Sequence, residues 1–180
     1  MTIFQRVRGR DGMEKQAMTC IQCGGKMTTK RENYRYAACG LPNVTLVGVE
    51  VRRCAKCGEH EVIIPRVEEL HRFLAATVAR QGSRLSKDEI RFLRKFLGYS
   101  GADFAKLISV TPETVSRWEH GRERITPSTE KLIRMLVVYK QPIRDYPIET
   151  LSMISDARPP RLLRVRSKGN SWVEQALKAA

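Results

Sequence analysis

The segment TPETVSRWEHG, residues 111–121, has the signals of a short, independently bounded helix. Thr111 is a preferred N-cap residue, and Pro112 suits the first helical position because no N–H is needed there. Gly121 is typical of the position just beyond a helix C-terminus. We therefore predict a helix between Thr111 and Gly121, and its length and polarity raise the question of what it contacts.

The two faces of this predicted helix differ in polarity. Val115 and Trp118 lie three positions apart, which indicates a face that packs into a core. The opposite face is polar and consists of Glu113, Ser116, Arg117 and His120, at helical spacing. These side chains can bond to base edges in a DNA major groove, although any one of them alone could be an ordinary solvated residue.

The surrounding residues 84–140 predict four closely spaced helices. Ser86 and Glu89 have capping-box spacing, Ser100 is a second N-cap, and Thr126–Pro127 repeats the start signal of Thr111–Pro112. Two short helices joined by a tight turn, the second with a polar outer face, describe a helix-turn-helix. The expected core residues are Ile90, Leu93, Phe96, Leu97, Phe104, Ala105, Leu107, Ile108, Leu132, Ile133, Leu136 and Tyr139.

Arg117 is the strongest candidate for recognising the DNA sequence, because a guanidinium can donate two hydrogen bonds to one guanine, at O6 and N7. Thr111, at the helix N-terminus, can hydrogen-bond to a DNA phosphate, and Ser116 can hydrogen-bond to a base or a phosphate. Glu113 either accepts from cytosine N4 or is a favourable anion in the first turn. The full set of predicted DNA-binding residues is Thr111, Glu113, Ser116, Arg117, His120, Arg122 and Arg124.

Residues 18–64 contain all five cysteines, four of them in two C-x-x-C-G motifs. The pairs are Cys20 with Cys23 and Cys54 with Cys57, and strand-forming residues separate them. Such motifs supply four thiolates in a closed tetrahedron, so we predict one structural zinc ion. An iron–sulfur cluster, or two redox-active cysteine pairs, are the alternatives. Cys39 is expected to be a small buried residue, and His60 and His71 are not needed as ligands.

The composition indicates a basic chain without a membrane anchor. The formal net charge is +14, which favours an anionic partner such as nucleic acid or an acidic protein. No apolar run approaches the length of a membrane span, and residues 1–17 lack the apolar stretch of a secretory signal. We expect a cytoplasmic protein, in which cysteines more often bind metal than form disulfides.

Residues 90–136 resemble the XRE, or lambda-repressor-like, helix-turn-helix family, most specifically in SRWEHG. The resemblance implies a structural role for Glu119. The combination of a four-cysteine ribbon with this helix-turn-helix is similar to the MqsA (YgiT-type) antitoxins. It implies a zinc domain that neutralises a toxin and a dimeric helix-turn-helix domain that represses its own operon. It also implies base contacts at the positions of Glu113 and Arg117.

The sequence thus predicts an α+β protein, with a small β-rich zinc ribbon followed by an all-α, lambda-repressor-like domain. The expected organisation is a disordered arm at 1–17, the ribbon at 18–64, a linker helix at 65–83, the helix-turn-helix domain at 84–140 and a partly disordered extension at 141–180, with short helices near 148–156 and 171–179.

The expected function is that of a homodimeric, DNA-binding repressor with no enzymatic activity. It would bind a palindromic operator in double-stranded DNA and act as the antitoxin of a toxin-antitoxin system. A regulator without a toxin and an adaptor that binds only protein are the alternatives. The basic tail from Arg158 to Lys178, with six lysines or arginines, would either strengthen non-specific DNA contact or be a solvated end.

Overall fold

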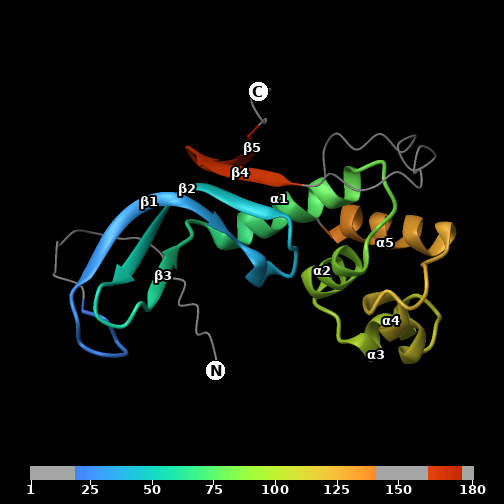
Figure 1. The fold of residues 1–180 in the computed structure, drawn as a ribbon. Coiled ribbons are helices and arrows are strands. Elements are labelled where there is room, and N and C mark those ends of the chain that lie inside the picture. Colours follow the sequence, from blue (N-terminus) through green and yellow to red (C-terminus); the bar gives the residue numbers. More distant parts are fainter. Residues whose placement is uncertain (1–18, 141–161, 176–180) are drawn as a thin grey trace. The chain divides into compact units, whose positions relative to one another are not determined.

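The computed structural model describes residues 19–140 and 162–175, which form two compact units (Figure 1). The sheet unit comprises residues 19–35, 44–69 and 163–175, and the helical unit comprises residues 36–43, 70–140 and 162. The predicted arm at 1–17 and the predicted helix at 148–156 lie outside the described residues. An α+β fold is confirmed, with a strand-rich cysteine-containing region followed by helices.

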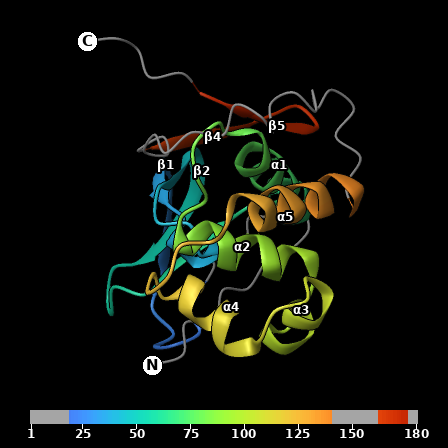
Figure 2. The same ribbon diagram turned by 90° about the vertical axis from the view of Figure 1, so that its right-hand side faces the viewer.

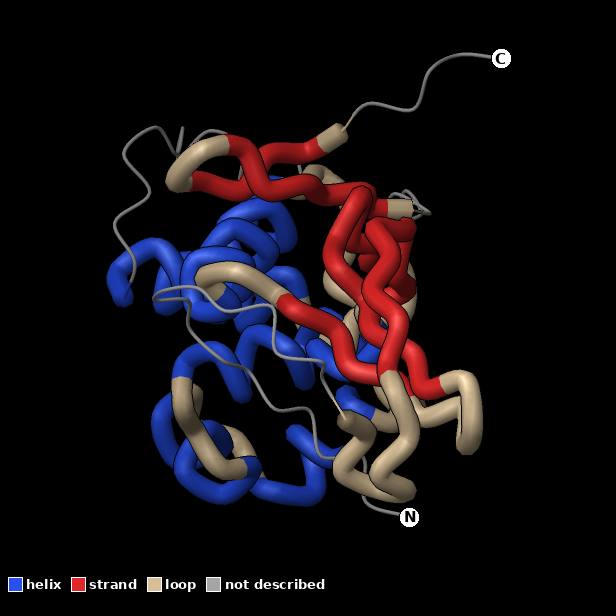
Figure 3. Tube along the Cα trace, turned by 90° about the vertical axis from the view of Figure 1, so that its left-hand side faces the viewer, coloured by secondary structure: helices blue, strands red, loops and turns tan. Residues whose placement is uncertain are grey.

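The sheet unit is built around one long strand. Its strands are β1 (Met27–Arg35), β2 (Val44–Cys54), β3 (His60–Ile63), β4 (Leu163–Lys168) and β5 (Ser171–Glu174). They are ordered β1-β2-β4-β5, and β3 also pairs with β2. Figure 3 shows the strands in red. One edge of β2 pairs with β1. On the other edge, the start of β2 pairs in parallel with β4, and the later part of β2 pairs antiparallel with β3.

Buried and exposed side chains alternate along β2, which explains the central position of this strand in the sheet. Val44, Leu46, Val49 and Val51 are buried, and the intervening side chains are half-buried or exposed. A β-bulge in β2, where Val47 and Gly48 oppose the single β1 residue Asn33, keeps Leu46 and Val49 on the same face despite their odd spacing. Gly48 has a φ of 65°, which a glycine adopts without a steric penalty, and its N–H donates to Asn33 Oδ1 at 3.2 Å.

The C-terminal residues correct one prediction, because Ser171–Glu174 forms strand β5 and not the start of a helix. Leu163, Val165 and Trp172 are buried on the same side of the β4–β5 hairpin, which shows a period of two. The spacing of Ser171 and Glu174 also fits a capping box, which suggested a helix. Tertiary packing of the alternating residues determines the local structure instead.

The helical unit contains five helices among the described residues (Figure 2). They are α1 (Val67–Arg80), whose first turn belongs to the sheet unit, α2 (Lys87–Leu97), α3 (Gly101–Leu107), α4 (Pro112–Glu119) and α5 (Pro127–Lys140). The predicted caps are confirmed: Ser86 forms a capping box with Glu89, and Ser100 and Thr111 accept backbone N–H bonds from Asp103 and Thr114.

Helix α1 was expected to be a linker, but from Leu70 onward it is part of the helical unit. Leu70, Leu74 and Val78 are buried. The fully buried Arg134 of α5 donates to the carbonyls of Val78, Ala79 and Gln81 at 2.7–3.2 Å. These carbonyls at the end of α1 lack helical partners, so Arg134 provides their hydrogen bonds.

The predicted core of the helical unit is correct in part. Ile90, Leu93, Leu97, Phe104, Ala105, Ile108, Val115, Trp118 and Ile133 are buried, whereas Phe96 and Leu136 are half-buried. Leu107, Leu132 and Tyr139 are exposed, which corrects the expectation that they are core residues. In α5 the buried face is occupied by Glu130, Ile133, Arg134 and Val137, so two charged side chains lie where an apolar pattern was expected.

Candidate metal centre and nucleic-acid interface

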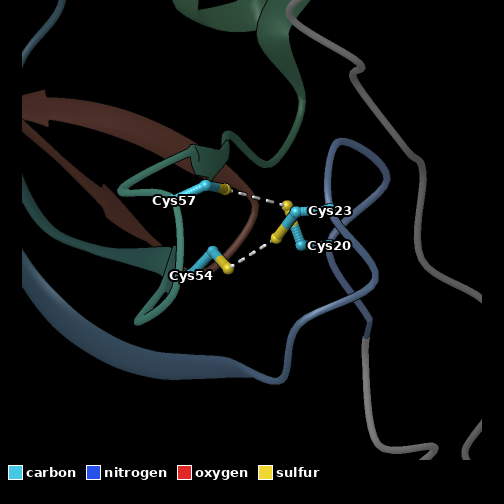
Figure 4. Close-up of side chains that lie close together, drawn as sticks. All are labelled: Cys20, Cys23, Cys54 and Cys57. Atoms are coloured by element: carbon cyan, nitrogen blue, oxygen red, sulfur yellow. Dashed lines mark hydrogen bonds between the residues drawn. The ribbon is translucent and has the colours of Figure 1, made fainter.

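The four cysteines of the C-x-x-C motifs converge on one point of the sheet unit (Figure 4). Cys20 and Cys23 come from the loop before β1, Cys54 is the last residue of β2, and Cys57 lies in the loop between β2 and β3. All four Sγ atoms lie within 4.8 Å of one another. The Sγ–Sγ distance is 3.6 Å for Cys20–Cys57 and 3.5 Å for Cys23–Cys54.

The two loops have the same backbone pattern, which explains the glycine after each pair. Gly24 N–H donates to Cys20 O at 2.8 Å, and Gly58 N–H donates to Cys54 O at 3.0 Å. Both glycines have a positive φ, 68° and 76°, which favours glycine over other residues. A Cβ added at Gly25 would lie 3.1 Å from Cys54 Sγ, so this second glycine allows the backbone to approach the sulfurs.

The thiols differ in their tendency to ionise because they are so close together. The backbone N–H of Cys57 and other hydrogen bonds lower the pKa of Cys54 to about 6. For Cys57, the N–H of Glu59 favours the thiolate, but the Cys23 sulfur, burial and the other sulfurs together raise its pKa to about 12. All four thiols can be ionised together at these distances only if a cation compensates their charge. The cysteine cluster is therefore suited to holding a metal ion.

The remaining cysteine and the histidines lie outside this cluster. Cys39 is half-buried in a 3₁₀ turn, Ala37–Cys39, and its Sγ donates to Tyr36 O at 3.0 Å; burial raises its pKa. His60 is an exposed residue at the start of β3. His71 Nε2 forms a 3.1 Å hydrogen bond with the Tyr36 hydroxyl, and burial lowers the pKa of His71.

Helix α4 is held in the helical unit by its apolar face and by one buried carboxylate. Val115 and Trp118 are 2% and 3% exposed. Glu119 accepts from Arg94 Nε at 2.6 Å and from Arg91 Nε at 3.4 Å. Burial disfavours the ionised form of Glu119, but the two guanidiniums outweigh it and hold its pKa below the usual value. The structural role that the resemblance implied for Glu119 agrees with these contacts.

All seven predicted DNA-binding residues lie at the surface, on α4 or just beyond it. Thr111 caps the helix, and Glu113 lies in its first turn. The pKa of Glu113 is lowered, first by its own backbone N–H and then by the Thr111 hydroxyl, with a smaller effect of Arg117. These helix-terminal contacts explain an acidic residue at this position without any contact to DNA.

Arg117 has partners that the sequence did not reveal. Its Nε donates to Glu123 Oε2 at 2.7 Å, and its Nη2 donates to Thr114 Oγ1 at 3.0 Å. Ser116 O lies 2.7 Å from His120 Nδ1, so these residues also contact each other. Glu123 lies beyond the helix, six positions after Arg117, where helical periodicity does not apply. The guanidinium of Arg117 therefore lies between Glu123 and Thr114 at the surface of the helical unit.

Comparison with known proteins agrees with this geometry. No helix within the described residues is long and apolar enough to cross a bilayer. A search of curated proteins found no match to the chain. Residues 90–146 match the helix-turn-helix family model. This part of the chain is an XRE-type helix-turn-helix domain, which implies a DNA-binding transcriptional regulator.

Proposed function

We propose that the protein is a sequence-specific transcriptional repressor that reads its operator with helix α4. The supporting observation is that α4 is fixed by Val115, Trp118 and Glu119 on one face and exposes Glu113, Ser116, Arg117 and His120 on the other. A capped, immobilised helix with a polar outer face suits insertion into a major groove. The surface arginines after α4, Arg122 and Arg124, are available for backbone phosphates.

The direct test is to incubate the metal-loaded protein with genomic fragments and sequence those it retains. We expect one palindrome to be enriched, upstream of the protein's own gene, and transcription from it to fall when the protein is supplied. Enrichment of scattered sites would indicate a wider regulator. Retention no better than that of random DNA would contradict the proposal and favour a protein-binding adaptor.

Replacing Arg117 by alanine should weaken binding to the selected fragment by about 1–3 kcal/mol, because a bidentate base contact is lost. Arg117→Lys is the informative comparison, because it keeps the charge and removes the planar fork. We expect both variants to lose discrimination between the selected fragment and random duplex, measured by fluorescence anisotropy. A lysine variant that discriminates as well as the wild type would exclude bidentate readout.

We further propose that the protein acts as a homodimer, joined through helix α5. Leu132, Met135 and Tyr139 are 41%, 56% and 89% exposed and lie three and four positions apart, so they share one face of α5. An exposed apolar stripe of this kind is typical of an interaction site. A second copy is the occupant that suits a palindromic site, with half-sites about 34–36 Å apart.

Met135→Glu should convert the dimer to a monomer, because it places a charge in an apolar contact. Sedimentation velocity over a range of protein concentrations measures this change. Met135→Leu keeps the apolar surface and should remain dimeric. A glutamate variant that sediments as the wild type does would rule out this face of α5 as the interface.

We propose zinc as the metal and a structural role for it. A tetrahedron with Zn–S bonds of about 2.3 Å has edges of about 3.8 Å, close to the 3.5–3.6 Å between the paired sulfurs. The four cysteines would fill the coordination shell, so we propose no catalytic activity. Elemental analysis of purified protein distinguishes zinc from iron, and an iron–sulfur cluster would absorb visible light.

The antitoxin role is the finer part of the proposal. It is supported by the resemblance and by the presence of a four-cysteine sheet unit together with a helix-turn-helix. If the gene beside the selected palindrome encodes a toxin, co-expression should restore growth and the two proteins should co-purify through the sheet unit. Growth inhibition that persists despite co-expression would favour a regulator without a toxin.

A further inference from the structure

The β4–β5 hairpin has a row of cations on its outer face. Leu163 and Val165 are buried, so the alternate residues Arg164, Arg166 and Lys168 lie on the opposite face. Arg166 pairs in register with Val173, and Lys168 with Ser171. We call Arg164, Arg166 and Lys168 the cationic row. Its members line one side of a strand.

The cationic row is not neutralised within the described residues. Among the described residues, no ion pair or hydrogen bond involves the side chains of its members; Ser171 Oγ donates to Lys168, but to its backbone O, at 3.3 Å. The two arginines of β2, by contrast, are paired: Arg52 lies 3.0 Å from Glu50, and Arg53 pairs with Glu32. The contrast indicates that the charges of β4 are available to a ligand rather than used to stabilise the sheet.

The hairpin that presents this row is fixed in place. Arg66 donates to Ser167 Oγ at 2.9 Å and to Asn170 Oδ1 at 3.4 Å, and it also pairs with Glu69 at 2.8 Å. Arg66 has a φ of 46°, an uncommon conformation for a residue with a side chain. Trp172 of β5 is only 4% exposed. A fixed scaffold lowers the entropy cost of binding.

From these observations we propose that the cationic row binds the phosphate backbone of duplex DNA, as a second contact separate from helix α4. This inference depends on the proposed DNA-binding function and adds a site to it. Three cations at alternate positions span about 13 Å of strand, which corresponds to about four nucleotides of one DNA strand. A protein-binding face would be expected to have an apolar or aromatic centre, whereas the in-register neighbours of the row are Thr45, Val173 and Ser171, of which only Val173 is a large apolar residue.

The test uses the full-length, metal-loaded protein and a random-sequence duplex of about 30 base pairs, so that no operator is needed. Arg166→Gln with Lys168→Gln should reduce the slope of log K against log salt by about 1.8, because two phosphate contacts are lost. Arg166→Lys with Lys168→Arg keeps both charges and should leave the slope unchanged. The fluorescence of the two buried tryptophans, Trp118 and Trp172, and the metal content verify that each variant remains folded.

An unchanged slope in the glutamine variant, while the wild type binds duplex DNA, would overturn the inference alone. The proposed function would then still be judged by the Arg117→Lys variant on the selected fragment. A reduced slope on duplex RNA but not on DNA would also overturn the inference, because it would assign the row to another nucleic acid. If the wild type binds no duplex DNA, both proposals fail together.

Discussion

Cys54→Ser, or removal of the metal ion by a chelator, is expected to unfold the sheet unit around the cysteine cluster. The small core there consists of Cys20, Met27 and Cys54, with Cys23 packed against it, so most of its apolar atoms belong to the ligands themselves. Structural zinc sites contribute about 10–16 kcal/mol to the folding of zinc-finger peptides at neutral pH. The apolar contacts of this small core are too few to replace the stabilisation that the metal ion provides.

Two-dimensional amide NMR should detect this change unit by unit. We expect loss of chemical-shift dispersion for residues near β1–β3, while signals of α2–α5 persist. Cys39→Ser is the matched control, because Cys39 lies outside the cluster and should leave the metal content unchanged. Lowering the pH should release the metal, because protons compete for the thiolates. Dispersion that survives confirmed metal removal would show that the site is not structural.

The second large effect is expected from Glu130→Ala in the helical unit. Glu130 and Arg134 are both fully buried, and Arg134 Nη2 donates to Glu130 Oε1 at 2.8 Å. Arg84 Nε donates to Glu130 Oε2 at 2.6 Å, and Leu85 N donates to Oε1 at 3.0 Å. Removing the carboxylate leaves a buried guanidinium without its counter-charge, which costs about 3–5 kcal/mol.

Urea unfolding followed by circular dichroism at 222 nm measures this loss. Glu123→Ala provides the control, because Glu123 also pairs with an arginine but both side chains are about half exposed, 49% for Arg117 and 45% for Glu123. An exposed pair of this kind contributes about 0–1 kcal/mol. Equal unfolding free energies for Glu130→Ala and Glu123→Ala would show that the buried network adds nothing to stability.

Much of the helical unit could be predicted because its signals are local. The caps at Ser86, Ser100 and Thr111 each depend on residues within one turn. The burial of Arg134 could not be predicted, because Glu130 and Arg134 have the spacing of an ordinary surface ion pair. Its position depends on the end of α1, more than fifty residues earlier, whose carbonyls it binds.

The cysteine cluster could be predicted for the same reason, since each C-x-x-C-G turn is a local structure. The C-terminal strands were not, because β4 is stabilised by pairing with Val44–Leu46, a contact that is remote in sequence. The exposed face of α5 was also missed, since apolar periodicity does not distinguish a core from an interface. Leu132 and Tyr139 fit the pattern of a buried stripe and yet lie at the surface.

The pairing of Val44–Leu46 with Leu163–Val165 also determines when the sheet can be completed during synthesis. The ribosome makes β1, β2, β3 and helices α1–α5 before β4 exists, so residues 44–46 of β2 have one unpaired edge until residues 163–165 are made. Open strand edges on nascent chains are prone to pair with other chains. We therefore expect a nascent or truncated protein that ends before Leu163 to aggregate more readily and to depend more on chaperones than the full-length protein.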